Sequence, residues 1–338
     1  MENGYVKPKL KEIRDYRDSS AVNQSLLKGI ESGYVKRKRN TISMCLGSLL
    51  DAYLCVNELL EDLFIIADNR PTDIICNIVE FVFNNSLVLD NNNLEDFKKE
   101  IILSFNTYSY QANWKIDTKV NTVIIKGSEY FELLKKKGEK EIVTLEECIN
   151  SANTVGILYN TEPAKSVLLS VTQFQVALYG ICEGVRIKGL LDCISIDENN
   201  KHIIITDIKR TEYPLSQLKK VIEKFQYIFQ LSFYRFLVKF NYPEYTVSCQ
   251  LLFISAFNSS SCVWKISDTD MDFYECGYYI IEKSIFSEEL DKTIVSTEYK
   301  KGCKNLLNIF KQCKEIGLNH FDLNLYYKNY ILNESIFD

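Results

Sequence analysis

Hydrophobic and polar residues alternate through the middle of the chain at the two-residue period of a half-buried β-strand. The alternation covers three segments, 171–179, 185–196 and 201–208. Glu183-Gly184 and Glu198-Asn199-Asn200 separate them, and connections this short are typical of antiparallel hairpins. The pattern predicts a three-stranded meander, then a strand rich in β-branched and aromatic residues over 246–256 and one more over 278–285.

Helical spacing of apolar residues predominates on both sides of the meander. It covers 43–64, 72–84, 94–106 and 144–157 before it, and 216–240 and 296–316 after it. A meander enclosed by helices predicts an α/β fold, in which a central mixed β-sheet is flanked by helices and carries helical N- and C-terminal additions.

No repeat, Pro-rich linker or low-complexity tract divides the chain. We expect residues 1–160 to be a helical N-terminal region that packs on the core, residues 161–290 to be the core, and residues 291–338 to be a C-terminal helical extension. Length alone allows one large domain or two small ones, and we expect one compact domain overall.

Composition limits the compartment and the metal. The 11 cysteines include no Cys-x-x-Cys pair, which fits reduced thiols in a cytoplasm better than a disulfide framework or a zinc ribbon. The chain contains no run of about 18 uncharged apolar residues, so we expect no membrane partner. The charged start of the chain also lacks the apolar core of a signal peptide. His202 and His320 are the only histidines of the chain and lie far apart in sequence, so a metal site built on histidine is not expected. Oxygen ligands, and hence magnesium or manganese, are favoured.

The net charge of −5 argues mildly against a nucleic-acid partner, although the distribution of charge matters more than its sum. Basic residues gather at Lys36-Arg37-Lys38-Arg39, and further clusters lie at 135–137, 219–220 and 300–304. The ordinary interpretation of any one cluster is a solvated surface, while a DNA-facing patch on an acidic protein stays open.

The two predicted turns bring acidic residues into one row. The first turn places Asp192 opposite Gln175, and the second places Asp192 opposite Asp207. Directly paired residues share a sheet face, with Cβ atoms about 4.5–5.5 Å apart. Lys209 shares the face of Asp207, and the carbonyl of Ile208 lies beside the row.

Such a row suits metal-dependent phosphodiester chemistry. A hard divalent ion binds carboxylate and carbonyl oxygens, polarises a phosphoryl oxygen and lowers the pKa of a bound water. Lys209 could then position the water or stabilise charge on the phosphate. The ordinary interpretation is that both aspartates lie at strand ends and that Lys209 pairs with one of them. The apolar run Ile203-Ile204-Ile205 favours the functional interpretation, because a buried strand that ends in charges needs partners for them.

Several short motifs follow one another in a fixed order over residues 20–258. They are Asn23-Gln24-Ser25-Leu26-Leu27, Cys45-Leu46-Gly47-Ser48-Leu49-Leu50-Asp51, Gly189-Leu190-Leu191-Asp192, Thr206-Asp207-Ile208-Lys209, and Gln226 with Gln230-Leu231-Ser232-Phe233-Tyr234. Together they resemble the signature of the PD-(D/E)XK nucleases, and most of all the phage exonuclease-like branch that includes lambda exonuclease and the RecE and RecB nuclease domains. Each motif alone is weak, and their combined order and spacing are specific.

The resemblance implies a restriction-endonuclease-like core and a role for each matching residue. Asp192 and Asp207 resemble the metal-binding carboxylates, Ile208 the residue that supplies a backbone carbonyl, and Lys209 the catalytic lysine.

Further matches come from two helices. Gln230 and Tyr234, with Gln226 one turn earlier, resemble the helix face that lines the active site. Asp51 resembles the residue that completes the metal site. For these positions a solvated helix face is the ordinary alternative.

One position departs from the family pattern. Members of the family often carry a glutamate on the strand before the Gly-x-x-Asp strand, where the turn geometry places Gln175. Either glutamine is a tolerated variant that supplies a neutral oxygen, or the site is weakened.

The expected function is Mg²⁺- or Mn²⁺-dependent hydrolysis of DNA, as an exonuclease in phage-like recombination or replication. Candidate DNA contacts are Gln226, Lys36, Arg37, Lys38 and Arg39. The alternatives are a DNA- or protein-binding module that no longer cleaves and a structure-specific endonuclease. A homo-oligomer and a single-strand annealing protein are further candidate partners.

Overall fold

The structure, a computed structural model, describes residues 21–31, 42–55, 60–182, 184–211, 213–255, 260–287 and 292–315. The chain divides into two compact units. The sheet unit holds Met1–Arg39 and Ile157–Asp338, and the helical unit holds Asn40–Gly156. This division differs from the three predicted segments, because residues 21–31 group with the sheet rather than with the helices that follow them.

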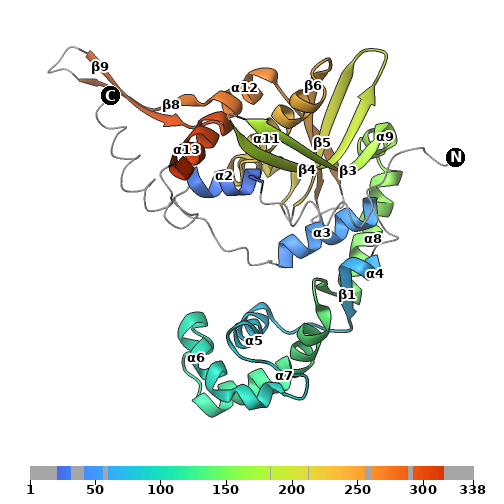
Figure 1. The fold of residues 1–338 in the computed structure, drawn as a ribbon, viewed down its shortest axis with the longest axis vertical. Coiled ribbons are helices and arrows are strands. Elements are labelled where there is room, and N and C mark those ends of the chain that lie inside the picture. Colours follow the sequence, from blue (N-terminus) through green and yellow to red (C-terminus); the bar gives the residue numbers. More distant parts are fainter. Residues whose placement is uncertain are drawn as a thin grey trace. The chain divides into compact units, whose positions relative to one another are not determined.

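A five-stranded mixed sheet forms the centre of the sheet unit (Figure 1). Its strands, in spatial order, are β3 (Gln173–Cys182), β4 (Val185–Asp197), β5 (His202–Thr211), β6 (Thr246–Ser255) and β7 (Ser261–Ile266). β5 and β6 are parallel, and the other neighbours are antiparallel. The predicted α/β class, with a mixed sheet flanked by helices, is confirmed.

The predicted register of the meander is also confirmed. Cys182 pairs with Val185 across the first turn, and the same register continues to Val176 and Leu191. Across the second turn Asp197 pairs with His202, and the register continues to Cys193 and Thr206. Short turns set both registers, because the first cross-strand pair fixes all the pairs that follow.

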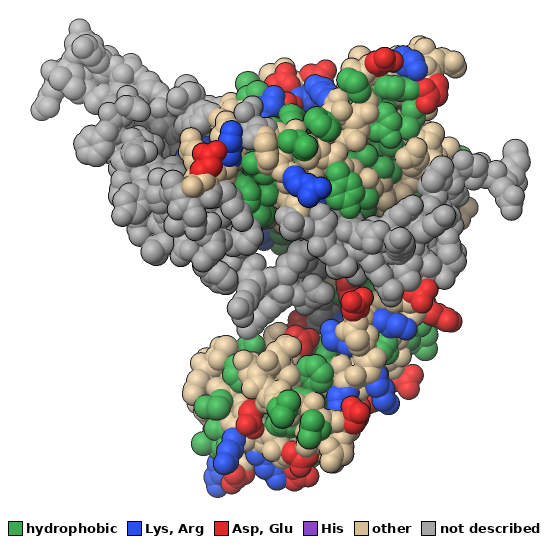
Figure 2. All heavy atoms as spheres, in the orientation of Figure 1, with side chains coloured by type: hydrophobic (Ala, Val, Ile, Leu, Met, Phe, Trp, Pro, Cys, Tyr) green, Lys and Arg blue, Asp and Glu red, His purple; other side chains and the backbone are tan. Residues whose placement is uncertain are grey.

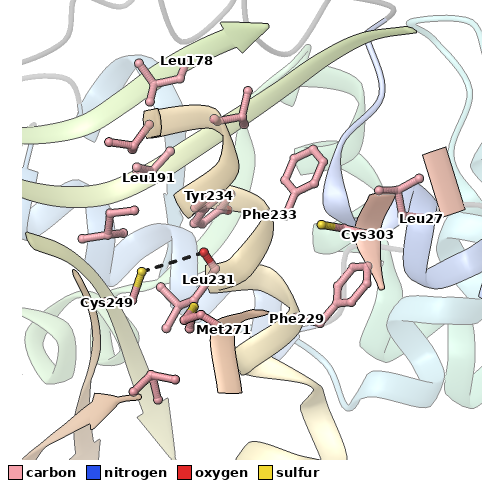
Figure 3. Packing of buried hydrophobic residues seen from close by; sticks show 14 of the residues in the cluster. Leu27, Leu178, Leu191, Phe229, Leu231, Phe233, Tyr234, Cys249, Met271 and Cys303 are labelled. Carbon is pink, nitrogen blue, oxygen red and sulfur yellow. Dashed lines mark hydrogen bonds between the residues drawn. The ribbon is translucent and has the colours of Figure 1, made fainter. Parts of the chain in front are cut away.

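Most helices of the sheet unit contribute to one large apolar core. The helices of this unit are α2 (Gln24–Glu31), α9 (Ala164–Ser170), η3 (Leu215–Gln217), α10 (Leu218–Phe225), α11 (Tyr227–Asn241), α12 (Asp268–Cys276) and α13 (Cys303–Glu315). α11 lies across β3 to β6 and directs Phe229, Leu231 and Phe233 into the core, where Figure 3 shows Phe229 and Phe233 on the side of Cys303 and Leu27. The Sγ atom of Cys249 in β6 lies 4.0 Å from the carbonyl oxygen of Leu231.

The N-terminal segment contributes to this core. Val22 forms a parallel bridge with Ile187 of β4, and its carbonyl accepts the Lys188 N–H at 2.8 Å. The side chain of Asn23 accepts the Leu26 N–H at 3.0 Å, as an N-cap does. Leu27 is fully buried in the core. The segment therefore anchors α2 beside β4 and α11.

The long helix predicted over 216–240 is interrupted, which corrects the sequence-based prediction. Gln226 has a left-handed φ of +52° and separates α10 from α11. This conformation costs a non-glycine residue about 1–2 kcal/mol. Packing offsets the cost, since Val221 and Ile222 of α10 and Phe229 of α11 are all buried in the same core. Tertiary contacts thus override a continuous helical pattern.

The C-terminal extension also differs from the prediction, because it begins as a strand. β8 (Tyr278–Ser287) and β9 (Lys292–Lys300) form a separate antiparallel hairpin, and α13 begins only at Cys303. The β-branched residues of the segment Thr293-Ile294-Val295-Ser296-Thr297 favour a strand over a helix. Residues after Glu315 lie outside the described residues.

The helical unit has a smaller core of its own. Its elements are α3 (Ile42–Cys55), α4 (Leu60–Leu63), β1 (Phe64–Ala67), α5 (Asp73–Asn85), η2 (Leu94–Phe97), α6 (Lys98–Tyr108), α7 (Ile116–Lys137), β2 (Glu141–Thr144) and most of α8 (Leu145–Asn160). β1 and β2 form a short parallel pair. Gly127 of α7 allows a close approach, since a Cβ there would lie 2.6 Å from Val79 Cγ2. None of the described helices is long and apolar enough to span a membrane.

Candidate metal and catalytic centre

The candidate centre lies where β4 and β5 stop pairing. Their ladder ends at Cys193 and Thr206, while β5 continues to pair with β6 as far as Thr211. At the next position Asp192 bonds through its side chain instead, and Oδ2 accepts the Ile208 N–H at 2.7 Å. A strand residue projects its N–H and C=O to the same edge, so the Ile208 carbonyl also faces the β4 side.

Asp207 is fully buried and is the focus of the polar contacts. The Nζ atom of Lys209 lies 2.7 Å from Asp207 Oδ2, as an ion pair. The side-chain amide of Gln230 donates to Asp207 Oδ1 at 3.1 Å. A buried carboxylate needs such partners, because removing its charge from water is costly unless the charge is paired.

Gln230 and Tyr234 reach the centre from α11. The Nε2 atom of Gln230 donates to the Tyr234 hydroxyl at 3.0 Å and also to Asp207, so the pair lies on the helix face predicted from its four-residue spacing. Gly189 makes this approach possible. A Cβ at Gly189 would lie 2.7 Å from Leu237 Cδ1 and 3.1 Å from Tyr234 Cδ1. The glycine of the Gly-x-x-Asp motif therefore brings α11 close to the sheet.

The charges of two carboxylates affect the pKa of Lys209. Its side chain is 18% exposed, and burial alone would lower its pKa. The negative charges of Asp207 and Asp192 outweigh burial and raise the pKa of Lys209 above its ordinary value. The ammonium group is therefore held positive between the two acids.

Tyr227 also belongs to the centre, although it is part of none of the sequence motifs. The Lys209 Nζ atom lies 5.2 Å from the centroid of the Tyr227 ring, a cation–π distance. Burial raises the pKa of the Tyr227 hydroxyl above its ordinary value. Its position three residues before Gln230 on a helix would have indicated a shared face.

Gln175 lies opposite Asp192 in an irregular part of β3. It falls between the paired residues Phe174–Cys193 and Val176–Leu191, and its φ of +47° is left-handed. Leu191 and Ile194 both lie in the apolar core that α11 covers. On a regular strand, residues three apart point to opposite faces, so the side chains of β4 change face between these two residues. Side-chain alternation is thus interrupted at Gln175 and Asp192, and strain of this kind is concentrated at functional sites.

The oxygen atoms near this irregularity form a limited donor set. Among the residues that the structure describes, no group of three or more His, Cys, Asp or Glu side chains could hold a metal ion. Two carboxylates, Asp192 and Asp207, and the carbonyl of Ile208 are present, and Gln175 lies opposite Asp192 in the strand register. Such oxygens fit a hard ion such as Mg²⁺ or Mn²⁺, and not a site that requires thiolate or imidazole ligands.

The remaining predicted site residues lie on other segments of the chain. Gln226 is exposed at the junction of α10 and α11, where its φ of +52° is left-handed, and its role as a DNA contact stays a prediction. Asp51 is half-buried on α3 in the helical unit, and its metal role stays a prediction. The basic cluster 36–39 lies outside the described residues.

The comparisons with known proteins add no family to this picture. No protein-family model matches the chain, and no curated protein matches it.

Proposed function

We propose that the sheet unit is a metal-dependent DNA nuclease of the PD-(D/E)XK type. The observation that carries the proposal is the convergence of Asp192, Asp207 and Lys209 where β4 and β5 separate, with Gln230 bonded to Asp207 from the facing helix. A structural ion pair alone requires only one acid and one base. Here a second carboxylate, a strand edge and a helix amide converge on the same pair.

Each residue has a distinct proposed role. The carboxylates of Asp192 and Asp207, with the carbonyl of Ile208 and the side-chain oxygen of Gln175, would hold Mg²⁺ or Mn²⁺. When bound, such an ion polarises a phosphoryl oxygen and lowers the pKa of a bound water. Lys209 would then share Asp207, and its ammonium would attract the scissile phosphate or orient the attacking water.

Gln230 and Tyr234 serve the proposed reaction by positioning. Gln230 donates to Asp207 and so limits rotation of that carboxylate. Tyr234 accepts from the same amide and packs against Gly189, which fixes the amide in turn. Small displacements of positioned groups cost large factors in rate, so this chain of contacts supports a catalytic rather than a purely structural arrangement.

The distribution of charge removes the main objection to DNA as the substrate. Residues 40–156 contain 18 acidic and 10 basic residues, whereas the rest of the chain contains 27 acidic and 30 basic residues. The acidic excess thus belongs to the helical unit, and Figure 2 shows acidic and basic side chains mixed over its visible face. A sheet unit with a small basic excess is compatible with a polyanionic substrate.

The test is digestion of end-labelled linear DNA and closed circular DNA with Mg²⁺, with Mn²⁺ or with EDTA. We expect metal-dependent products from linear DNA only, as an exonuclease gives, and no products from Asp207→Asn. Nicked circles would identify an endonuclease instead. If neither substrate is cut under any metal condition, the nuclease proposal is wrong.

One observation favours a second candidate, a nuclease-fold module that binds DNA or a protein without cleaving. Gln175 supplies no charge where a third carboxylate would strengthen the centre, and Lys209 already neutralises Asp207. For this candidate we expect binding of linear DNA without metal-dependent products.

A further inference from the structure

Exposed aromatic rings and lysine side chains gather beside the candidate centre. Tyr213 is 41% exposed and Phe225 is 44% exposed. The Lys224 Nζ atom lies 6.0 Å from the Tyr213 ring centroid and 5.3 Å from that of Phe225. Among the described residues Lys224 has no acidic partner. The two rings therefore share one ammonium group at the surface.

This surface continues inward to the centre. The rings of Phe225 and Tyr227 are stacked, with centroids 5.6 Å apart and planes inclined by 20°. The ammonium of Lys209 lies 5.2 Å from the other ring of that pair, Tyr227, and 2.7 Å from Asp207. Aromatic and basic groups thus alternate from Tyr213 at the surface to the buried carboxylate.

A second lysine reaches the surface from the N-terminal segment. The Lys28 Nζ atom donates to the Phe225 carbonyl at 3.0 Å and lies 5.9 Å from the Phe229 ring centroid. The left-handed backbone of Gln226 ends α10 directly after Phe225, where that ring stays exposed. The ammonium group of Lys224 therefore lies over the exposed Phe225 ring, and that of Lys28 lies at the backbone carbonyl of the same residue.

We propose that this aromatic-basic surface, formed by Tyr213, Phe225, Lys28 and Lys224, binds the unpaired bases and phosphates of a single DNA strand that leads into the centre. The rings offer flat faces on which bases stack whatever their sequence, and the lysines attract the phosphates. A duplex keeps its bases stacked on one another, so rings of this kind favour a single strand over paired DNA. The proposal deepens the proposed function and rests on it.

A purely structural interpretation is that the lysine stems shield the exposed rings. Continuity with the centre argues against it, because Tyr227 belongs both to the stacked pair and to the Lys209 site. The charges on the surface also have the sign that a nucleic-acid strand requires.

The test measures binding in EDTA, so that no cleavage is needed. The fluorescence anisotropy of a labelled oligothymidylate is titrated with the full chain, with Phe225→Ala and with Tyr213→Ala. We expect the loss of either ring to weaken the affinity for the strand by about tenfold or more. Phe240→Ala is the matched control, because Phe240 is 50% exposed at the far end of α11 and should bind as the parent does.

Two further arms identify what the surface recognises. An abasic strand of equal length should bind more weakly than oligothymidylate, and a blunt duplex should compete poorly. Phe225→Trp should retain binding and show quenched tryptophan emission when the strand stacks on it. This conservative variant keeps the test informative if Phe225→Ala does not fold.

The outcomes separate this inference from the nuclease proposal. Equal affinity of the parent and both ring variants, or equal affinity for abasic and normal strands, would overturn the inference even if metal-dependent cleavage occurs. Ring-dependent binding without any cleavage would support the surface and reject the nuclease proposal. If the parent does not bind the single strand in EDTA, the surface proposal is wrong.

Discussion

The carboxylate of Asp192 accepts the backbone N–H of Ile208 at 2.7 Å, just beyond the last backbone pair of β4 and β5. A side chain thus continues the hydrogen bonding where two strands separate. The bond fixes Asp192 beside the strand edge that carries Asp207 and Lys209. The same residue consequently has a structural contact and a proposed metal-binding role.

Variants of Asp192 should separate those two roles. Asp192→Ala leaves the Ile208 N–H without its acceptor, so we expect a loss of about 1–3 kcal/mol in the free energy of unfolding. Asp192→Asn keeps an oxygen acceptor and should lose much less stability. Both variants remove the negative charge, and both should abolish Mn²⁺-dependent cleavage. Urea denaturation and digestion on the same samples check this, and cleavage that survives in Asp192→Asn would exclude the metal role.

Lys209→Met should lower turnover without weakening the binding of a divalent ion. Lysine is no metal ligand, and its removal leaves Asp207 without the ammonium that competes for its carboxylate. We expect a fall in turnover of about 10²-fold or more and Mn²⁺ affinity at or above that of the parent. Calorimetric titration and single-turnover digestion measure the two quantities. A collapse of Mn²⁺ affinity would show that the roles are assigned wrongly.

Gly189→Ala should displace α11 from the sheet. The new Cβ would lie 2.7 Å from Leu237 Cδ1, and overpacking of this kind costs about 1–3 kcal/mol. The displacement should move Gln230 away from Asp207 and so reduce cleavage more than stability alone explains. Gly180→Ala is the control, since its Cβ would approach Phe240 Cδ1 only to 3.2 Å, at the other end of α11. Equal cleavage by both variants would contradict the positioning role.

Gln175→Glu should strengthen the binding of Mg²⁺ or Mn²⁺. Gln175 lies opposite Asp192 in the β3–β4 register, so a carboxylate there adds negative charge around the ion. In the absence of an ion the added charge repels Asp192, and we expect slightly lower stability. Mn²⁺ titration of the parent and the variant decides the matter. Equal affinities would mean that the Gln175 side chain lies outside the coordination sphere.

The carboxyl of Glu275 should make the free energy of unfolding depend on pH in the acidic range. Burial tends to raise the pKa of this carboxyl, but hydrogen bonds from Lys304 and Arg235, at 2.7 and 2.9 Å, lower it below its ordinary value. A lowered folded pKa stabilises the protein above the unfolded value of about 4.3, and that stability is lost as pH falls through the folded pKa.

Glu275→Gln tests this dependence. We expect the variant to be less stable than the parent by about 1–3 kcal/mol at neutral pH, because Arg235 and Lys304 lose a charged partner. The difference should shrink as the pH falls below about 4. Denaturation measured at several pH values checks it, and a difference that does not change with pH would point to packing rather than charge.

The amino-acid sequence by itself determined the local features of the candidate site. The short turn between Cys182 and Val185 sets the register that places Gln175 and Asp192 opposite one another, because a hairpin's register follows from its turn. The two-residue spacing of Asp207 and Lys209 and the four-residue spacing of Gln230 and Tyr234 put each pair on one face of its element. Contacts of this kind depend on backbone geometry that spacing alone specifies.

Only the tertiary structure decided how these elements meet. Nothing local indicates that β4 pairs with β5 only from Cys193 onward, that the helix breaks at Gln226, or that Lys28 reaches Phe225, a residue 197 positions away. These features arise because burying the apolar faces of several elements in one core outweighs local propensity and single strained residues. The close packing at Gly189 has the same origin, because a side chain at this position would clash only when α11 lies against β4.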